Sequence, residues 1–147
     1  MPRHVYHCPL RWSDMDAYGH VNNVRFLTLL EEARVALFFV AAEQAGVASL
    51  AGNVVVARHE IDYVSPLTFR TEPIPVDTWV DRIGAASVTI GYEVRDDAAV
   101  YARARTVAVA FDAAAGHTRR WTGPERAWLE RFYDTFPTDT SGRGSIG

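Results

Sequence analysis

The pattern of the sequence predicts an α+β domain in which a curved antiparallel sheet of about five strands wraps one long helix. Two observations support this fold class: a helical spacing of apolar residues over residues 22–45, and a later series of alternating segments joined by short turns. The length of 147 residues and the hydrophobic content of 48% fit one domain with a substantial core. We expect this domain to cover residues 1–136, and residues 137–147, rich in Thr, Ser and Gly, to form a flexible tail.

The first expected elements are a strand and the long helix. Residues 3–12 have a composition that suits a strand, with Pro9 at its edge because proline cannot donate to a ladder. Over residues 22–45, apolar side chains recur at i, i+3, i+4 and i+7, with an asparagine pair able to cap the start and Gly46 able to close the end. The apolar band is wide, so the helix must be covered on most of its circumference.

The remaining elements are strands and a short terminal helix. Strand patterns cover residues 53–64, 74–83, 87–95, 99–111 and 117–121, and residues 124–132 are typical of a helix. In the strand at residues 99–111 the even positions all carry small side chains, which lets the long helix approach the strand closely. These positions are Ala102, Ala104, Thr106, Ala108 and Ala110. The edges and outer face of such a sheet stay partly apolar, so we expect association through strands into a dimer or a dimer of dimers.

Composition excludes several classes of function. All 15 basic residues are arginine, and without lysine the chain cannot be a Schiff-base, pyridoxal-phosphate or Walker-type nucleotide protein. The net charge of -3 and the scattered arginines argue against nucleic-acid binding. The single cysteine, Cys8, excludes an internal disulfide and a multi-cysteine metal site, so we expect no metal. We find no apolar run of membrane-spanning length and no signal-peptide core, and we expect a cytoplasmic protein that binds no membrane.

The densest polar cluster lies in the loop directly before the long helix. It contains Asp14, Asp16 and His20, followed by Asn22 and Asn23. Unpaired N–H groups and the positive end of the dipole at a helix start favour developing negative charge. A carboxylate beside a carbonyl that those amides polarise is suited to acyl transfer. The alternative is that the aspartates form turns and the asparagines cap the helix, which accounts for each residue separately.

These residues resemble the signature of a known family. The stretch Asp16-Ala-Tyr-Gly-His-Val-Asn-Asn23, followed by Arg25-Phe-Leu and Glu31-Glu-Ala-Arg34, is similar to hotdog-fold thioesterases of the 4-hydroxybenzoyl-CoA thioesterase family, in the branch with an Asp-x-x-x-His-Val-Asn-Asn motif. Residues 61–63, with Pro66 three residues later, resemble the strand that follows the central helix in that family. The resemblance covers residues 5–112. It implies an acyl-CoA thioesterase that forms free acid and CoA without metal or organic cofactor, as a homodimer or homotetramer with active sites between subunits.

The resemblance also implies roles for individual residues. Asp16 would be the catalytic carboxylate, acting as nucleophile or as general base through a water, and Asp14 would support or cap the loop. We expect His20 to fix the loop by hydrogen bonds, with direct acid–base chemistry as the alternative. Amides near Val21, Asn22 and Asn23 would polarise the thioester carbonyl, and the Asn23 side chain would either contact substrate or cap the helix. Further candidates are Arg58, His59 and Tyr63 from the second protomer and Arg82 and Ser87 near CoA.

One departure from the family concerns the coenzyme A phosphates. Some relatives bind them with basic residues in the turn before the third strand of the sheet, whereas here that turn is Gly84-Ala-Ala-Ser87. Phosphate contacts would have to come from Arg82, from Arg58 or Arg103, or from backbone amides. This departure leaves two alternatives open, an acyl-acyl-carrier-protein thioesterase and a non-catalytic protein that binds acyl thioesters or aromatic ligands. A separate alternative is a hotdog dehydratase or hydratase, in which His20 or His59 would act on the substrate.

Overall fold

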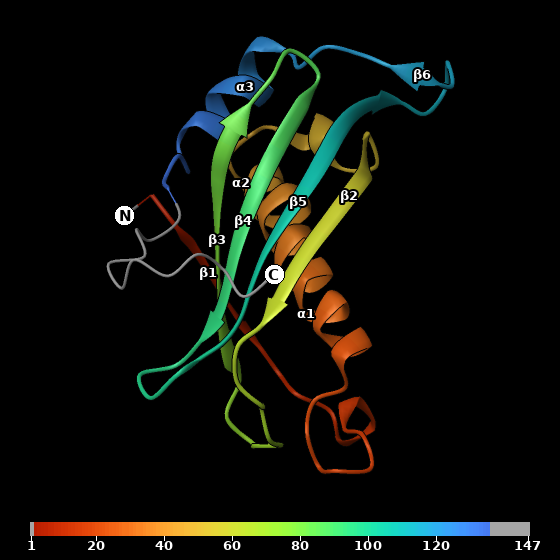
Figure 1. Ribbon diagram of the computed structural model, residues 1–147. Helices are drawn as coiled ribbons and strands as arrows, with labels where there is room; N and C mark the ends of the chain where they lie inside the picture. Colours follow the sequence, from red (N-terminus) through yellow and green to blue (C-terminus); the bar gives the residue numbers. More distant parts are fainter. Residues whose placement is uncertain (1, 136–147) are drawn as a thin grey trace, which may run out of the picture.

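The long helix lies in the concave side of a curled antiparallel sheet (Figure 1). The computed structural model describes residues 2–135, so the tail expected at residues 137–147 lies outside the described residues. The sheet has six strands in the order β1-β3-β4-β5-β2, with β6 paired to β5. The strands are β1 His4–Cys8, β2 Val54–Tyr63, β3 Ile74–Ile83, β4 Ser87–Arg95, β5 Val100–Asp112 and β6 His117–Thr118. The predicted fold class is confirmed.

The long helix is continuous from residue 23 to residue 44, as the apolar spacing predicts. It consists of α1 Asn23–Val35, a π-helical segment η2 Ala36–Ala41, and α2 Ala42–Gln44. The Asn22 side chain caps its start by accepting a hydrogen bond of 2.9 Å from the Val24 amide. Gly46 closes its end at a φ of +86°, a conformation that glycine adopts without strain. The π-helical segment was not predicted.

The core lies between the helix and the concave face of the sheet. The small even-numbered face of β5 is buried, and Thr106 is fully so. It belongs to the same buried region as the inner face of the helix, to which Phe26, Leu29, Leu30, Ala33 and Leu37 contribute. The small side chains on this face of β5 therefore leave room for the large side chains of α1.

A buried carboxylate joins the end of the chain to the rest of the domain. The terminal helix α3, Gly123–Glu130, begins with a capping box made by Thr122 and Glu125. Glu125 is fully buried and pairs with Arg119 at 2.7 Å. It also accepts a hydrogen bond of 2.8 Å from Ser49, which belongs to the short 3-10 helix η3, Ala48–Leu50. One side chain thus holds three segments of the chain together.

Two local predictions were wrong at the ends of strands. The first strand ends at Cys8, before Pro9, and residues 12–14 form a 3-10 turn, η1 Trp12–Asp14. Their size and hydrophobicity predict that the four tryptophans are packing residues, but Trp12 is 73% exposed because this turn carries it out of the core. The last strand is only two residues long, since Trp121 leaves the sheet to donate a hydrogen bond of 3.0 Å from its indole to the Ser87 carbonyl.

Candidate active site

The loop before α1 holds the Asp16 carboxylate in a fixed orientation. Its oxygen Oδ1 accepts hydrogen bonds from the amides of Tyr18 at 2.8 Å and His20 at 3.2 Å. The backbone closes the same turn: the Asp16 amide donates to the His20 carbonyl at 2.7 Å, and Gly19 has a φ of +74°. Within residues 2–135 the second oxygen, Oδ2, accepts no hydrogen bond. Asp16 is therefore both a turn former, as the alternative interpretation holds, and a carboxylate with one free oxygen.

The amides at the start of the helix are not equivalent. Val21 donates its N–H to the Leu67 carbonyl at 2.7 Å, and Asn22 donates to the Asp14 carbonyl at 2.8 Å. Both amides are therefore occupied, although the sequence suggested them as oxyanion donors. The Asn23 amide donates to no residue of the described chain. It is the amide at this helix start that is available to a ligand.

A cavity of about 240 Å³ lies beside Asp16. At one wall the Tyr63 hydroxyl donates to the Asn23 carbonyl at 2.7 Å, and the Tyr63 ring packs edge-on against Phe26 with centroids 5.5 Å apart. Tyr63, which the sequence suggested as a contribution from a second protomer, thus lies at the pocket of its own chain. The cavity is lined by Asp16, His20, Val21, Asn23, Phe26, Tyr63, Val64, Ser65 and Pro66.

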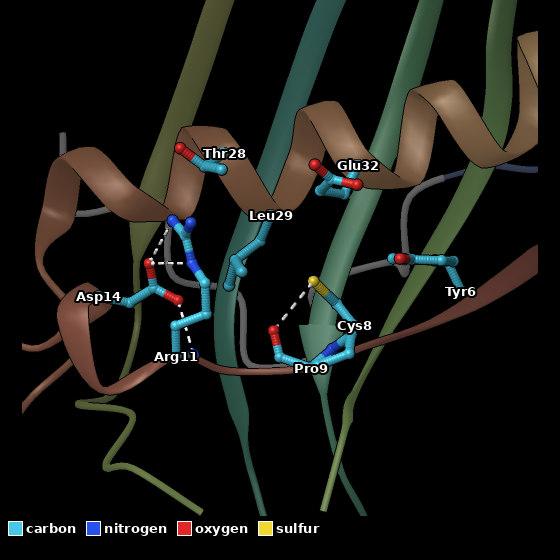
Figure 2. A pocket seen from close by; sticks show the side chains of 8 residues that line it. All are labelled: Tyr6, Cys8, Pro9, Arg11, Asp14, Thr28, Leu29 and Glu32. Atoms are coloured by element: carbon cyan, nitrogen blue, oxygen red, sulfur yellow. Dashed lines mark hydrogen bonds and ion pairs between the residues drawn. The ribbon is translucent and has the colours of Figure 1, made fainter.

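Asp14 points into a different cavity, on the β1 side of the helix (Figure 2). It is buried and accepts hydrogen bonds from the Arg11 amide and guanidinium, both at 2.9 Å. Burial alone would raise the pKa of Asp14, but these hydrogen bonds and the charge of Arg11 outweigh it and hold the pKa below its ordinary value. The supporting role expected for Asp14 is consistent with this ion pair.

Cys8 lines the same cavity and provides a chemical test of the fold (Figure 2). The thiol is buried, and burial, with smaller effects of Glu32 and Asp14, raises the pKa of Cys8 to about 11. Because the thiolate is the reactive form, we expect Cys8 to be unreactive toward a disulfide reagent at pH 8 in the native protein and to react fully in urea. Rapid labelling of the native protein would contradict this placement.

The two histidines near the site differ in their surroundings. The His20 imidazole lines the Asp16 cavity and hydrogen-bonds no residue of the described chain, so the loop is fixed by the His20 backbone and not by its ring. His59, on β2, has Nδ1 2.9 Å from the Thr106 hydroxyl. Burial lowers the pKa of His59, and the nearby charge of Arg34 lowers it further. His59 does not line the Asp16 cavity.

The arginines suggested for phosphate binding lie elsewhere. Arg58 is exposed on β2 and forms an ion pair with Glu60, and Arg103 pairs with Glu93 at 3.0 Å. Arg82, near the end of β3, is exposed.

Ser87 begins β4 in the turn that follows Arg82, at the opposite end of the sheet from the Asp16 loop (Figure 1). At this turn Arg126 donates to the Gly84 carbonyl at 3.2 Å. Sequence reasoning missed Arg126, since nothing in the sequence distinguishes it from the other scattered arginines.

Two further classes of site receive no support from the described residues. Residues 2–135 contain no group of three His, Cys, Asp or Glu side chains placed to hold a metal ion. Among the helices of these same residues, none has the length and apolar character needed to cross a membrane.

A curled antiparallel sheet around one long helix, with the chain entering that helix through a polar loop, defines a hotdog-fold protein. The chain belongs to the thioesterase-like superfamily, whose family model matches residues 10–132. No curated protein matches the chain.

Three solved structures illustrate the similarity. A predicted thioesterase from Bacillus stearothermophilus is 25% identical, with a TM-score of 0.81, over 92% of this chain and 99% of that chain. A Xanthomonas campestris protein proposed to be an acyl-CoA thioesterase is 33% identical, with a TM-score of 0.63, over 80% of this chain and 98% of that chain. A Thermus thermophilus thioesterase complexed with coenzyme A and zinc shares the fold at 24% identity, with a TM-score of 0.73, over 89% of this chain and 94% of that chain. The family model and the two neighbours at 25% and 33% identity support a thioesterase activity.

Proposed function

We propose that the chain hydrolyses acyl-CoA to free acid and CoA, with Asp16 as the essential carboxylate. One observation carries this proposal: two amides fix Oδ1 of Asp16 and leave Oδ2 free, and Asp16 lines a cavity at the start of the helix. The motif from Asp16 to Asn23 supports placing the chain in the Asp-x-x-x-His-Val-Asn-Asn branch of the family. The 33% identity to the Xanthomonas campestris protein supports an acyl-CoA substrate.

The proposed mechanism uses the free oxygen and the free amide together. The thioester oxygen accepts a hydrogen bond from the Asn23 amide, where the helix dipole stabilises the developing negative charge. Oδ2 of Asp16 either removes a proton from an attacking water or attacks the carbonyl carbon itself. The carbon–sulfur bond then breaks, and the thiolate leaves and takes up a proton, either the one that Asp16 removed from water or one from solvent. If Asp16 attacks directly, the acyl group stays on its carboxylate as a mixed anhydride, which a water molecule hydrolyses to the free acid and the Asp16 carboxylate. In this scheme His20 acts through its backbone, by orienting the carboxylate.

We further propose that β2 forms the contact between two copies of the chain. This strand is ten residues long and lies at one end of the strand order, so one of its edges has no partner within residues 2–135. Val55 and Val56 are each 43% exposed on it. A long strand edge with unpaired N–H and C=O groups and exposed apolar side chains is a template for pairing with another strand. Antiparallel pairing of two β2 strands would give a homodimer, with Arg58 and His59 near its centre, and two dimers could form a homotetramer.

A proline at Ala57 tests this arrangement. The ladder between β2 and β5 skips Ala57, because the register shifts between Val56 and Arg58. A proline there adds a ring and removes an N–H from β2, which disfavours pairing with a second strand, and it replaces no residue of a regular β2–β5 pair. We expect wild-type protein to sediment as a dimer or tetramer and Ala57→Pro to sediment as a folded monomer in analytical ultracentrifugation. A monomeric wild type would contradict the proposed interface.

The thiol carrier is tested by comparing thioesters of one acyl group. Because this turn lies at the far end of the sheet from the Asp16 loop of the same chain, we propose that Arg82 and Arg126 at the β3–β4 turn of the second copy contact the CoA phosphates. If so, acyl-CoA should be hydrolysed with a lower KM than the matching acyl-pantetheine, which lacks the nucleotide. Equal KM values would favour an acyl carrier protein or another carrier. Release of free thiol from short, medium, long and aromatic acyl-CoAs tests the activity itself, and binding without turnover would favour the non-catalytic alternative.

A further inference from the structure

Besides the Asp16 cavity, a second cavity lies between the long helix and β2, further along the helix; it is distinct from the Asp14 cavity on the β1 side. Its volume is about 350 Å³. Asn23 and Tyr63 meet beside Asp16, whereas Phe38 and Val56 line the second cavity, so the helix and β2 run past each other in opposite directions. Both cavities therefore lie between the same two elements. The second is lined by Glu31, Arg34, Val35, Phe38, Phe39, Val54, Val56 and Ala108.

Arg34 is the buried charge of this largely apolar cavity. Its side chain is only 12% exposed, and its Nη1 donates to the Tyr92 hydroxyl at 3.4 Å. Its nearest carboxylate, Glu31, lies 3.9 Å away, beyond hydrogen-bond distance, and is 64% exposed. A guanidinium carries five N–H donors, and in residues 2–135 one of them is used.

A buried cation with so few partners favours an anionic ligand. Burying a charge without a partner is costly, and a carboxylate is the group that a guanidinium binds best, through two parallel hydrogen bonds. The surrounding apolar walls suit a hydrocarbon segment. Together they match a ligand with an apolar body and a carboxylate at its far end.

We propose that Arg34 selects acyl groups whose distal end carries a carboxylate. This inference rests on the proposed thioesterase function: the thioester lies at Asp16 and Asn23, and the acyl chain extends along the helix toward Arg34. Asn23 and Arg34 are eleven residues apart, or about 16 Å along the helix at ~1.5 Å per residue. A hydrogen bond of ~3 Å at each end leaves about 10 Å of that span, which at ~1.2 Å per bond in an extended chain fits an acyl group of roughly eight to twelve carbons.

The test compares two substrates of equal length, ω-carboxynonanoyl-CoA and decanoyl-CoA. For the wild type we expect kcat/KM to be at least about 10-fold higher for the carboxylated substrate, since a hydrogen bond to a charged group contributes about that factor or more. Arg34→Met keeps an apolar stem close in length to that of arginine and removes the guanidinium with its charge, and should abolish the preference. Arg120→Met removes an exposed arginine and should leave the preference unchanged. A wild-type ratio of one or less would overturn the proposal, whether or not the Arg34 variant folds.

A binding measurement separates this inference from the proposed function. By calorimetry, decanoate, whose carboxylate can pair with Arg34, should bind the wild type at least about 10-fold more tightly than the neutral decanamide does, and Arg34→Met should lose the difference. If no acyl-CoA is hydrolysed but this binding difference is present, the proposed function fails and the selectivity of Arg34 stands. If both CoA esters are hydrolysed equally well, Arg34 does not select. A crystal structure of the assembly in which a carboxylate of the second copy pairs with Arg34 would also overturn the proposal.

Discussion

Replacing Asp16 with asparagine is expected to lower kcat for acyl-CoA hydrolysis by about 100- to 10,000-fold, the range typical for loss of a general base. Asparagine keeps a side-chain oxygen that can accept the hydrogen bonds from the Tyr18 and His20 amides, so the loop should keep its conformation. What is lost is the basic oxygen in the cavity. Thiol release under saturating substrate measures kcat, and circular dichroism and sedimentation check that the variant is folded and assembled.

Asp112→Asn is the matched control for this variant. Asp112 forms the same kind of turn, accepting hydrogen bonds from the amides of Ala114 at 3.1 Å and Ala115 at 3.0 Å, but it lies in the β5–β6 hairpin. Its replacement should leave kcat unchanged within a factor of two or so. Full activity in Asp16→Asn, with the protein folded, would refute the proposed role of Asp16 and leave its turn-forming role as the explanation of this residue.

The largest effect on stability is expected from Glu125→Ala. The carboxylate is fully buried, and its removal leaves the Arg119 guanidinium, which is only 20% exposed, without its partner. Loss of one member of a buried pair typically costs about 3–5 kcal/mol. The contacts to Ser49 and to the Thr122 amide are lost as well. Urea unfolding of the two proteins at pH 7 measures the difference in the free energy of unfolding.

Glu130→Ala supplies the comparison for an exposed pair on the same helix. Glu130 and Arg126 lie 3.3 Å apart, but their side chains are 51% and 44% exposed, so the cost should stay below about 1 kcal/mol. A similar loss of unfolding free energy in both variants would mean that burial does not make the Glu125 pair more stabilising than an exposed pair.

The contribution of Glu125 to the free energy of unfolding should also depend on pH. Burial alone would raise the pKa of Glu125, but hydrogen bonds from Arg119, the Thr122 amide and Ser49 outweigh it, and the pKa lies below its ordinary value. A carboxyl with a lowered pKa stabilises the fold above the pKa of the unfolded chain, about 4.3 for glutamate, and this contribution is lost as the pH falls through the folded pKa. The difference between wild type and Glu125→Ala should therefore shrink in acid below about pH 4.

The parts of the fold that were predicted correctly depend on local periodicity. The bounds of β3 and β4, residues 74–83 and 87–95, agree with their alternating patterns, and the small face of β5 is buried. The π-helical segment η2 could not be predicted, because the apolar spacing that marks a helix does not report which carbonyl each amide binds. Trp12 was placed wrongly for a related reason: its hydrophobicity gave no information about the turn that exposes it.

The candidate site was predictable only in part. The motif placed Asp16 and Asn23 at the helix start, because both are close in sequence to the capping signals. Which amide stays free depends on Leu67, whose carbonyl reaches Val21 from a loop more than forty residues away. Tyr63 contacts Asn23 across a similar separation. Contacts of this kind follow from how the sheet curls around the helix, and no single segment of the sequence contains that information.

The hydrogen bond from Tyr63 to Asn23 ties the last residue of β2 to the first residue of α1. If β2 also joins two copies of the chain, assembly and substrate binding become thermodynamically linked, since each stabilises the same contact. Linkage is reciprocal: a bound acyl thioester would tighten the assembly by the factor by which assembly tightens substrate binding. Activity per subunit would then fall on dilution below the concentration at which the copies separate, and substrate would shift that concentration downward.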